Sequence, residues 1–140
     1  MNLLAIDPGK RTGVVEIRDN ALFKASTLSP KEIHEGLIYG HWVYYKIWVI
    51  ERFSLYPWKS RVLSFSECLP AQIIGAVKLY THQQNIKLIL QTAGTIKGAI
   101  TDEQLKERRI CWYEKLKNKH ERDAAKHALY FLIKEGRFYE

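Results

Sequence analysis

Three acidic residues lie beside apolar segments, where an unpaired carboxylate is unfavourable. Asp7 ends the apolar run NLLAID, Glu51 ends a second run in WVIERF, and Asp123 flanks the apolar face of a predicted helix in HERDAAKHALYFL. Taking an ionised carboxylate out of water costs several kcal/mol unless it is paired or bound to a metal. Carboxylates grouped around one pocket suit Mg²⁺, and two such ions about 3.5–4 Å apart bind a phosphodiester for in-line attack by water.

Each acid alone also has an ordinary structural interpretation. Asp7 precedes Pro-Gly, as an Asx-turn residue does, Glu51 can end a surface strand, and Asp123 can complement a helix dipole in a first turn. The occurrence of all three in strand–strand–helix order favours a shared metal site. On the predicted last helix, His120 and His127 project from the same side as Asp123. We interpret His127 as a packing residue or as support for a metal ligand.

The elements that must position these residues follow from periodicity and turn signals. Continuous apolar runs at 2–7 and 43–50 predict buried strands, the second of them central. Residues 12–18 and 21–27 predict two further strands of an antiparallel meander, joined by a turn at Asp19-Asn20. If the strands that end at Asp7 and Glu51 are neighbours, their carboxylates converge. A fifth strand is predicted at 86–91.

Helices are expected between and after these strands. The predicted ranges are 29–40 with Ser29 as the cap, about 66–84, 101 to about 116 with a capping box at Thr101–Gln104, and 121–134. Residues 92–100 are predicted to form a Gly-rich loop, and 115–122 a basic link. Small alanines let the last helix pack close to the sheet. The pattern predicts one α/β domain over 1–140, a mixed sheet with helices packed on it.

Composition limits the class of protein. The chain has 140 residues, 46% of them hydrophobic, which favours one globular domain, and its formal charge of +7 favours a polyanionic partner, with nucleic acid first. A basic surface kept for solubility is the alternative. Cys68 and Cys111 are interpreted as buried, reduced thiols. We see no signal-peptide pattern and no membrane-spanning run, so we expect a cytoplasmic protein with no membrane partner.

Aromatic residues mixed with cations follow Glu51 and are typical of nucleic-acid contacts. The candidate DNA-binding residues are Phe53, Trp58, Lys59, Arg61, Lys97, Lys115, Lys117 and Lys119. Trp58 can equally pack beneath its loop, and each lysine taken singly can simply face solvent.

Three motifs together resemble RuvC-type Holliday junction resolvases of the ribonuclease H-like superfamily. LAIDPGKRTGVVEI is similar to the first motif of that family, WVIERF to the second, and HERDAAKHAL to the fourth. The resemblance implies a mixed five-stranded sheet, with three antiparallel meander strands and two parallel strands, and helices on both faces. The short region 29–42 is more similar to a minimal or phage-encoded resolvase, which implies a bacterial or infected-host cytoplasm.

The resemblance also implies a site and a reaction. Asp7, Glu51, His120 and Asp123 would form the catalytic and metal-binding set for two Mg²⁺ or Mn²⁺ ions, with His120 as a ligand or proton-transfer group. The substrate would be branched DNA, a four-way junction, hydrolysed to 5′-phosphate and 3′-hydroxyl ends. Junction symmetry implies a homodimer, with the helix at 66–84 as its interface, and no small-molecule cofactor is expected.

Two other functions stay open. DPGKRTG also resembles the start of YqgF-type ribonuclease H-like nucleases, which implies RNA or an RNA–DNA hybrid as the substrate. A basic nucleic-acid-binding module without catalysis is the remaining alternative, although the three acids speak against it.

Overall fold

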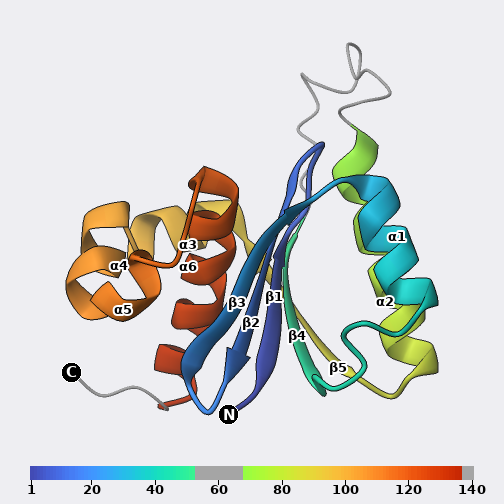
Figure 1. The fold of residues 1–140 in the computed structure, drawn as a ribbon, viewed down its shortest axis with the longest axis horizontal. Coiled ribbons are helices and arrows are strands. Elements are labelled where there is room, and N and C mark those ends of the chain that lie inside the picture. Colours follow the sequence, from blue (N-terminus) through green and yellow to red (C-terminus); the bar gives the residue numbers. More distant parts are fainter. Residues whose placement is uncertain (53–67, 137–140) are drawn as a thin grey trace.

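A five-stranded sheet separates two layers of helices in the computed structural model, which describes residues 1–52 and 68–136 without the side chain of Lys97 (Figure 1). Helices α1 and α2 cover one face, and α3 to α6 lie on the other. The elements are β1 (Leu3–Asp7), β2 (Thr12–Arg18), β3 (Ala21–Leu28), α1 (Pro30–Ile38), β4 (Ile47–Arg52), α2 (Leu69–Gln83), β5 (Lys87–Thr92), α3 (Ala93–Ala99), α4 (Asp102–Arg108), α5 (Ile110–Tyr113) and α6 (Lys119–Lys134).

The sheet confirms the predicted topology. The strand order is β3-β2-β1-β4-β5, with β1, β2 and β3 antiparallel and β4 parallel to both β1 and β5. Asp19 and Asn20 have φ of 52° and 63°, as a two-residue hairpin turn of type I′ requires. The expected sheet, with three meander strands and two parallel strands between helices, is therefore observed.

The strand register places the polar strand ends in one row. Ile6 pairs with Ile50 on the neighbouring parallel strand, so Asp7 and Glu51 each follow a paired residue, and Glu51 pairs with Gln91. Side chains alternate between faces along a strand. Because Ala5 and Val49 pack into the core beneath α6, the residues two positions on, Asp7 and Glu51, face the same side.

Two apolar cores hold the layers together. The core beneath α6 combines strand residues such as Leu3 and Val49 with Ala124, Ala125 and Ala128 of the helix. The core on the other face combines Leu4, Ile6 and Trp48 with side chains of α1 and α2. The predicted apolar face of the last helix is confirmed, since its alanines and Phe131 and Leu132 are buried.

Gly13 of β2 allows α6 to lie close to the sheet. A Cβ at position 13 would overlap the backbone carbonyl of His120 and would lie 3.1 Å from the Glu121 nitrogen. Only a residue without a side chain permits this approach. The Thr-Gly pair of the first motif therefore has a packing role at the start of α6.

A buried polar network fixes the first turn of α6. The Asn118 side chain caps the helix by accepting from the Glu121 nitrogen (3.0 Å), and its amide donates to the Thr27 hydroxyl (2.8 Å). Thr27 donates to the Glu121 carboxylate (2.8 Å), which is only 2% exposed and also accepts from the Lys117 nitrogen (3.1 Å). These contacts tie the helix start to β3.

Three predictions about where the helices lie are wrong. Residues 93–99, expected as a loop, form α3, whose Gly94 and Gly98 have open space where a Cβ would be. The helix expected from 101 to about 116 is interrupted at Arg109 (φ −142°, ψ 64°), which separates α4 from α5. The last helix begins at Lys119, two residues earlier than expected, because Asn118 supplies its cap.

The strand expected at 43–50 begins only at Ile47. Residues 41–44 form a turn after Gly40, whose φ is +69°. Trp42 and Tyr45 are buried from this turn, and the Trp42 ring occupies the space beside Gly36. Trp42 and Tyr45 thus reach the core without lying in a strand, whereas Val43 and Tyr44 are exposed.

The two cysteine side chains are more exposed than the sequence predicts. Cys111 is exposed and Cys68 is partly exposed, so the expectation of two buried thiols is wrong.

Among the helices of the described ranges, none combines the length and apolar character that crossing a membrane requires.

Candidate metal centre

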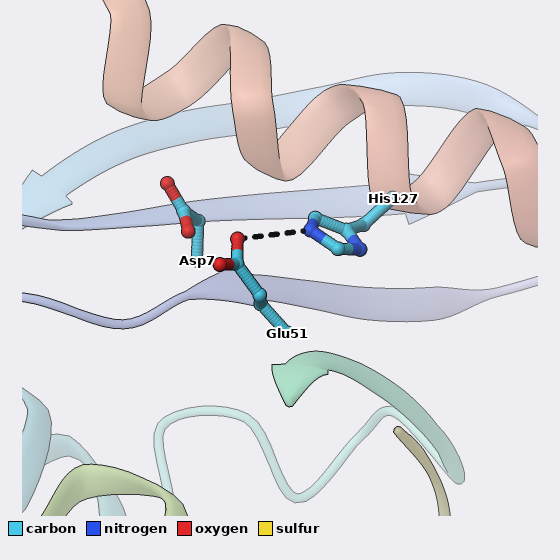
Figure 2. A group of neighbouring side chains, drawn as sticks. All are labelled: Asp7, Glu51 and His127. Atoms are coloured by element: carbon cyan, nitrogen blue, oxygen red, sulfur yellow. Dashed lines mark hydrogen bonds and ion pairs between the residues drawn. The ribbon is translucent and has the colours of Figure 1, made fainter. Parts of the chain in front are cut away.

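Asp7 and Glu51 stand side by side where two parallel strands end. Both carboxylates are partly buried, and Figure 2 shows them close to each other beneath α6. They come together because β1 and β4 are neighbours in the sheet and both side chains face the helix. The convergence expected from the sequence is therefore present.

His127 supplies a third group from α6. One ligand atom from each of Asp7, Glu51 and His127 lies within 4.8 Å of the others. The Nε2 of His127 is 3.2 Å from Glu51 Oε2, and its Nδ1 is 2.9 Å from Gln91 Oε1. The His127 ring is 1% exposed, so the sheet and α6 hold it firmly.

Asp123 and His120 lie outside this group in the described structure. Asp123 is four residues before His127 on α6, and its carboxylate is 3.6 Å from Lys126 Nζ. His120 is partly buried in the first turn of α6, where its carbonyl lies against Gly13. The structure thus joins Asp7 and Glu51 to His127, and their joint use with His120 and Asp123 stays a prediction.

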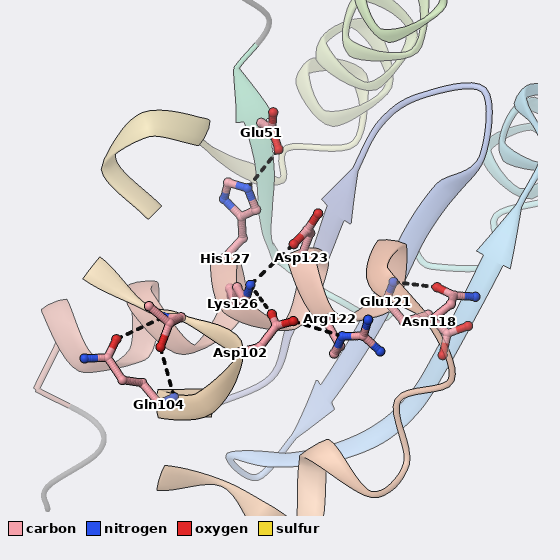
Figure 3. A network of polar contacts seen from close by, with 10 residues as sticks. Glu51, Asp102, Gln104, Asn118, Glu121, Arg122, Asp123, Lys126 and His127 are labelled. Carbon is pink, nitrogen blue, oxygen red and sulfur yellow. Dashed lines mark hydrogen bonds and ion pairs between the residues drawn. The ribbon is translucent and has the colours of Figure 1, made fainter. Parts of the chain in front are cut away.

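A chain of ion pairs links Asp123 to α4 through Lys126 and Asp102 (Figure 3). Lys126, whose side chain is 12% exposed, contacts both Asp102 of α4 and Asp123. Arg122 lies 3.5 Å from the other Asp102 oxygen. The hydrogen bond from Lys126 and the nearby positive charges lower the pKa of Asp102 from its ordinary value. The pairs connect α4 to the helix that carries the site.

The turn after Asp7 is held by a buried hydroxyl. Thr12 is fully buried, and its Oγ1 accepts from the Gly9 nitrogen and donates to the Gly9 carbonyl, both at 3.2 Å. The chain therefore turns away directly after the carboxylate. Lys10 and Arg11 are exposed on this turn.

The predicted DNA-binding residues are only partly described. Phe53, Trp58, Lys59 and Arg61, and the side chain of Lys97, lie outside the described residues. Lys115 donates to the Leu22 carbonyl (3.3 Å), which ties it to β3. Lys117 and Lys119 are exposed just before and at the start of α6.

Another pair of cations lies near the carboxyl ends of the parallel strands. Arg52, directly after Glu51, and Lys78 of α2 line a pocket of about 360 Å³ whose other walls include Ile74 and Leu90. Arg52 and Lys78 are both exposed. The sequence pattern alone does not distinguish them from other exposed cations.

The sequence pattern gives Gln91 no role, and it predicts His127 only as a packing residue or as support for a metal ligand. A polar residue ending the apolar strand LILQ was the available signal for Gln91, because a buried amide needs a partner. For His127 the signal was its position one helical turn after Asp123. Neither pattern shows that Gln91 and His127 contact each other in the folded protein.

Solved structures share this architecture. Thermus thermophilus RuvC in complex with a Holliday junction substrate matches with a TM-score of 0.72 and 16% identity, over 98% of this chain and 97% of that chain. A second Thermus thermophilus RuvC structure matches with a TM-score of 0.65 and 17% identity, over 98% of both chains.

A viral protein matches as well. The Fowlpox virus resolvase in complex with its Holliday junction substrate has a TM-score of 0.65 and 12% identity, over 94% of this chain and 99% of that chain. Neither a protein-family model nor a curated protein matches the sequence. The chain therefore has the ribonuclease H-like fold in the form found in RuvC-type resolvases.

The donor set fits a divalent cation. Carboxylate oxygens are the preferred ligands of Mg²⁺ and Mn²⁺, and imidazole nitrogen is accepted more readily by Mn²⁺. Asp7, Glu51 and His127 present such atoms within 4.8 Å of one another at the rim of the sheet.

Proposed function

We propose that this chain is a metal-dependent, structure-selective endonuclease that resolves four-way or otherwise branched DNA by phosphodiester hydrolysis. The observation that carries the proposal is the convergence of Asp7, Glu51 and His127 within 4.8 Å. This group lies in a fold shared with proteins solved on Holliday junctions. The net charge of +7 supports a polyanionic substrate.

The proposed site uses residues of three elements. Asp7 and Glu51 bind the cations, and Asp123 and His120 complete the set that the sequence motifs imply, with His120 as a ligand or proton-transfer group. Two bound Mg²⁺ or Mn²⁺ ions would supply an activated water and charge stabilisation at the scissile phosphate. Arg52, Lys10 and Arg11, all exposed near the site, are suited to the flanking phosphates.

A homodimer is part of the proposal. Four-way junctions have near-twofold symmetry, and paired nicks need two sites with matching symmetry. The groove between α1 and α2, about 450 Å³ in volume, is lined by Ile38 and Leu79, which are 77% and 61% exposed. We assign this apolar face to the second copy. Leu79→Glu is expected to shift the mass measured by light scattering from dimer to monomer.

The decisive experiment compares substrates. A four-way junction, a flap, a linear duplex, an RNA duplex and an RNA–DNA hybrid are incubated side by side with Mg²⁺ or Mn²⁺. Paired, symmetric nicks confined to the junction are the expected result. Preferential cutting of RNA or hybrid would replace the proposal with a ribonuclease function.

A matched pair of variants tests the site. Asp7→Asn is expected to bind the junction but lose metal-dependent cleavage, because it removes a charged ligand without changing shape. Asp19→Asn makes the same chemical change at the exposed β2–β3 turn, where φ is 52°, and is expected to retain cleavage. Undiminished cleavage by Asp7→Asn would refute the assigned site, and junction binding without cleavage by the unmodified chain would indicate a non-catalytic module.

A further inference from the structure

The His127 ring is held between an amide and a carboxylate. Gln91 of β5 pairs in register with Glu51 of β4, so both side chains stand on the sheet face beneath α6. Gln91 Oε1 is 2.9 Å from His127 Nδ1, and Glu51 Oε2 is 3.2 Å from Nε2. Gln91 is 8% exposed and His127 is 1% exposed. Burial therefore leaves the ring little choice of hydrogen-bond partners.

This pairing limits where the ring proton resides. A neutral imidazole carries one N–H, and an amide oxygen only accepts. With Oε1 facing Nδ1, the proton lies on Nδ1 and the Nε2 lone pair points to the Glu51 carboxylate. Two acceptors 3.2 Å apart repel each other, and either a second ring proton on Nε2 or a metal cation between or beside them removes this repulsion. Neighbouring ligands of an octahedral ion at ~2.1 Å are about 3 Å apart, which fits this separation.

We infer that His127 is a nitrogen ligand of the metal centre and that Gln91 is the positioning residue that holds its ring in the ligating tautomer. The inference rests on the metal centre of the proposed function and adds a donor outside the set implied by the sequence motifs. A hydrogen-bond acceptor behind a ligating imidazole orients the ring and raises its basicity, and its loss typically weakens metal binding about 10–100-fold.

The opposite arrangement makes a different prediction. With the Gln91 amide rotated by half a turn, its NH₂ donates to Nδ1 and the Nε2–H donates to Glu51. The ring is then a structural link between α6 and the sheet, and it contributes no lone pair. In that case Gln91 affects stability and not the metal.

Pulsed electron paramagnetic resonance of Mn²⁺ bound to the full chain distinguishes a metal-ligating His127 from a purely structural one. We use the His120→Ala background, which removes the other histidine of α6. Coupling of Mn²⁺ to a ¹⁴N nucleus is expected there, and adding His127→Leu is expected to abolish it. Absence of coupling in the His120→Ala protein would overturn the inference.

Gln91 variants give an independent measurement if His127→Leu does not fold. Gln91→Met keeps the size of the side chain but loses the amide acceptor, so the Mn²⁺ dissociation constant should rise about 10–100-fold. Gln91→Glu keeps an acceptor at Nδ1 and should restore tight binding. Equal Mn²⁺ affinity for the three proteins, measured per folded molecule, would show that Gln91 is structural and overturn its positioning role.

These outcomes separate the inference from the proposed function. Mn²⁺-dependent nicking of junctions without nitrogen coupling overturns the inference alone. Nitrogen coupling without cleavage of any nucleic acid supports the inference and overturns the nuclease proposal. Failure to bind either Mn²⁺ or Mg²⁺ overturns both.

Discussion

The carbonyl of His120 occupies the space that a side chain at Gly13 would need. This contact joins β2 to the first turn of α6, four residues upstream of the first buried alanines of that helix. The position of α6 over the sheet, and with it the placing of Asp123 and His127, therefore depends on a single missing methyl group.

Gly13→Ala is expected to destabilise the protein by about 1–3 kcal/mol, because α6 must move away from the sheet. The same variant should weaken Mn²⁺ binding, since His127 moves with the helix. Gly75→Ala is the control. Gly75 lies in α2 with open space where a Cβ would be, and alanine there should stabilise the helix by about 0.5–1 kcal/mol. Urea unfolding measures the change in stability of both variants. Equal changes for Gly13→Ala and Gly75→Ala would contradict the packing explanation.

Metal binding should be visible as thermal stabilisation. A ligand that binds only the folded state at 100 times its dissociation constant adds about 2.7 kcal/mol. Mg²⁺ or Mn²⁺ is therefore expected to raise Tm by several degrees, and chelation should reverse the change. Asp7→Asn should lose this response and Asp19→Asn should keep it. A response that persists in Asp7→Asn would place the bound ion elsewhere.

A buried tyrosine should make stability fall at high pH. Tyr45 is fully buried, donates to Glu16 Oε1 and accepts from Arg18 Nε, both at 2.9 Å. Burial raises its pKa from 10.0 to about 12. The neutral form is thus favoured by folding, so its contribution is complete below pH 10 and is lost as the pH rises to 12, by about 3 kcal/mol in total.

Tyr45→Phe should remove this part of the alkaline loss, whereas the part from Tyr80, whose pKa is also raised by burial, should remain. At neutral pH Tyr45→Phe should also cost about 1–3 kcal/mol, because the buried Glu16 loses its donor. Tyr44→Phe, at a neighbouring residue that is 54% exposed, should leave the alkaline loss in place. Denaturant unfolding between pH 8 and pH 12 compares the three, and an unchanged slope in Tyr45→Phe would reject the assignment.

The Asp102 ion pairs should contribute stability that acid removes. Asp102→Asn is expected to cost about 1 kcal/mol at neutral pH, because Lys126 and Arg122 lose a shared partner and α4 loses a first-turn acid. Since folding lowers the pKa of Asp102, the difference from wild type is complete above the ordinary value of 3.8 and shrinks as pH falls below it.

Glu35→Gln is the matched control for this network. Its partner Lys31 is 3.8 Å away, and their side chains are 47% and 86% exposed, so the variant should change stability by less than ~0.5 kcal/mol. Unfolding at pH 7, 5, 4 and 3 provides the comparison. A difference for Asp102→Asn that does not vary with pH would contradict the electrostatic explanation.

Local signals predicted much of this fold. The Asp19-Asn20 turn, the helix cap at Ser29, the capping box at Thr101 and the buried strand β1 are encoded within a few neighbouring residues, and all are observed. The convergence of Asp7 and Glu51 also followed, because it needed only two adjacent parallel strands. Features that depend on neighbouring residues in the sequence could therefore be predicted.

The remaining features depend on contacts across the fold. Helical spacing places His120, Asp123 and His127 on one side of α6. It does not determine the position along each strand at which the helix crosses the sheet. The crossing position is fixed by the close contact at Gly13 and by the hydrogen bonds of Glu121. It brings His127 next to Gln91 and Glu51. Likewise, the apolar Tyr45 was predicted as part of a strand, although it is buried by core packing before the strand begins.

The three groups of the candidate metal centre come from positions far apart along the chain, at 7, 51 and 127. A ribosome makes the two carboxylates early and the imidazole late. Until α6 has emerged and docked, a nascent chain has both acids but neither the nitrogen nor the cover over that face of the sheet. Binding of a metal ion by all three groups therefore requires that α6 has been synthesised and has docked on the sheet.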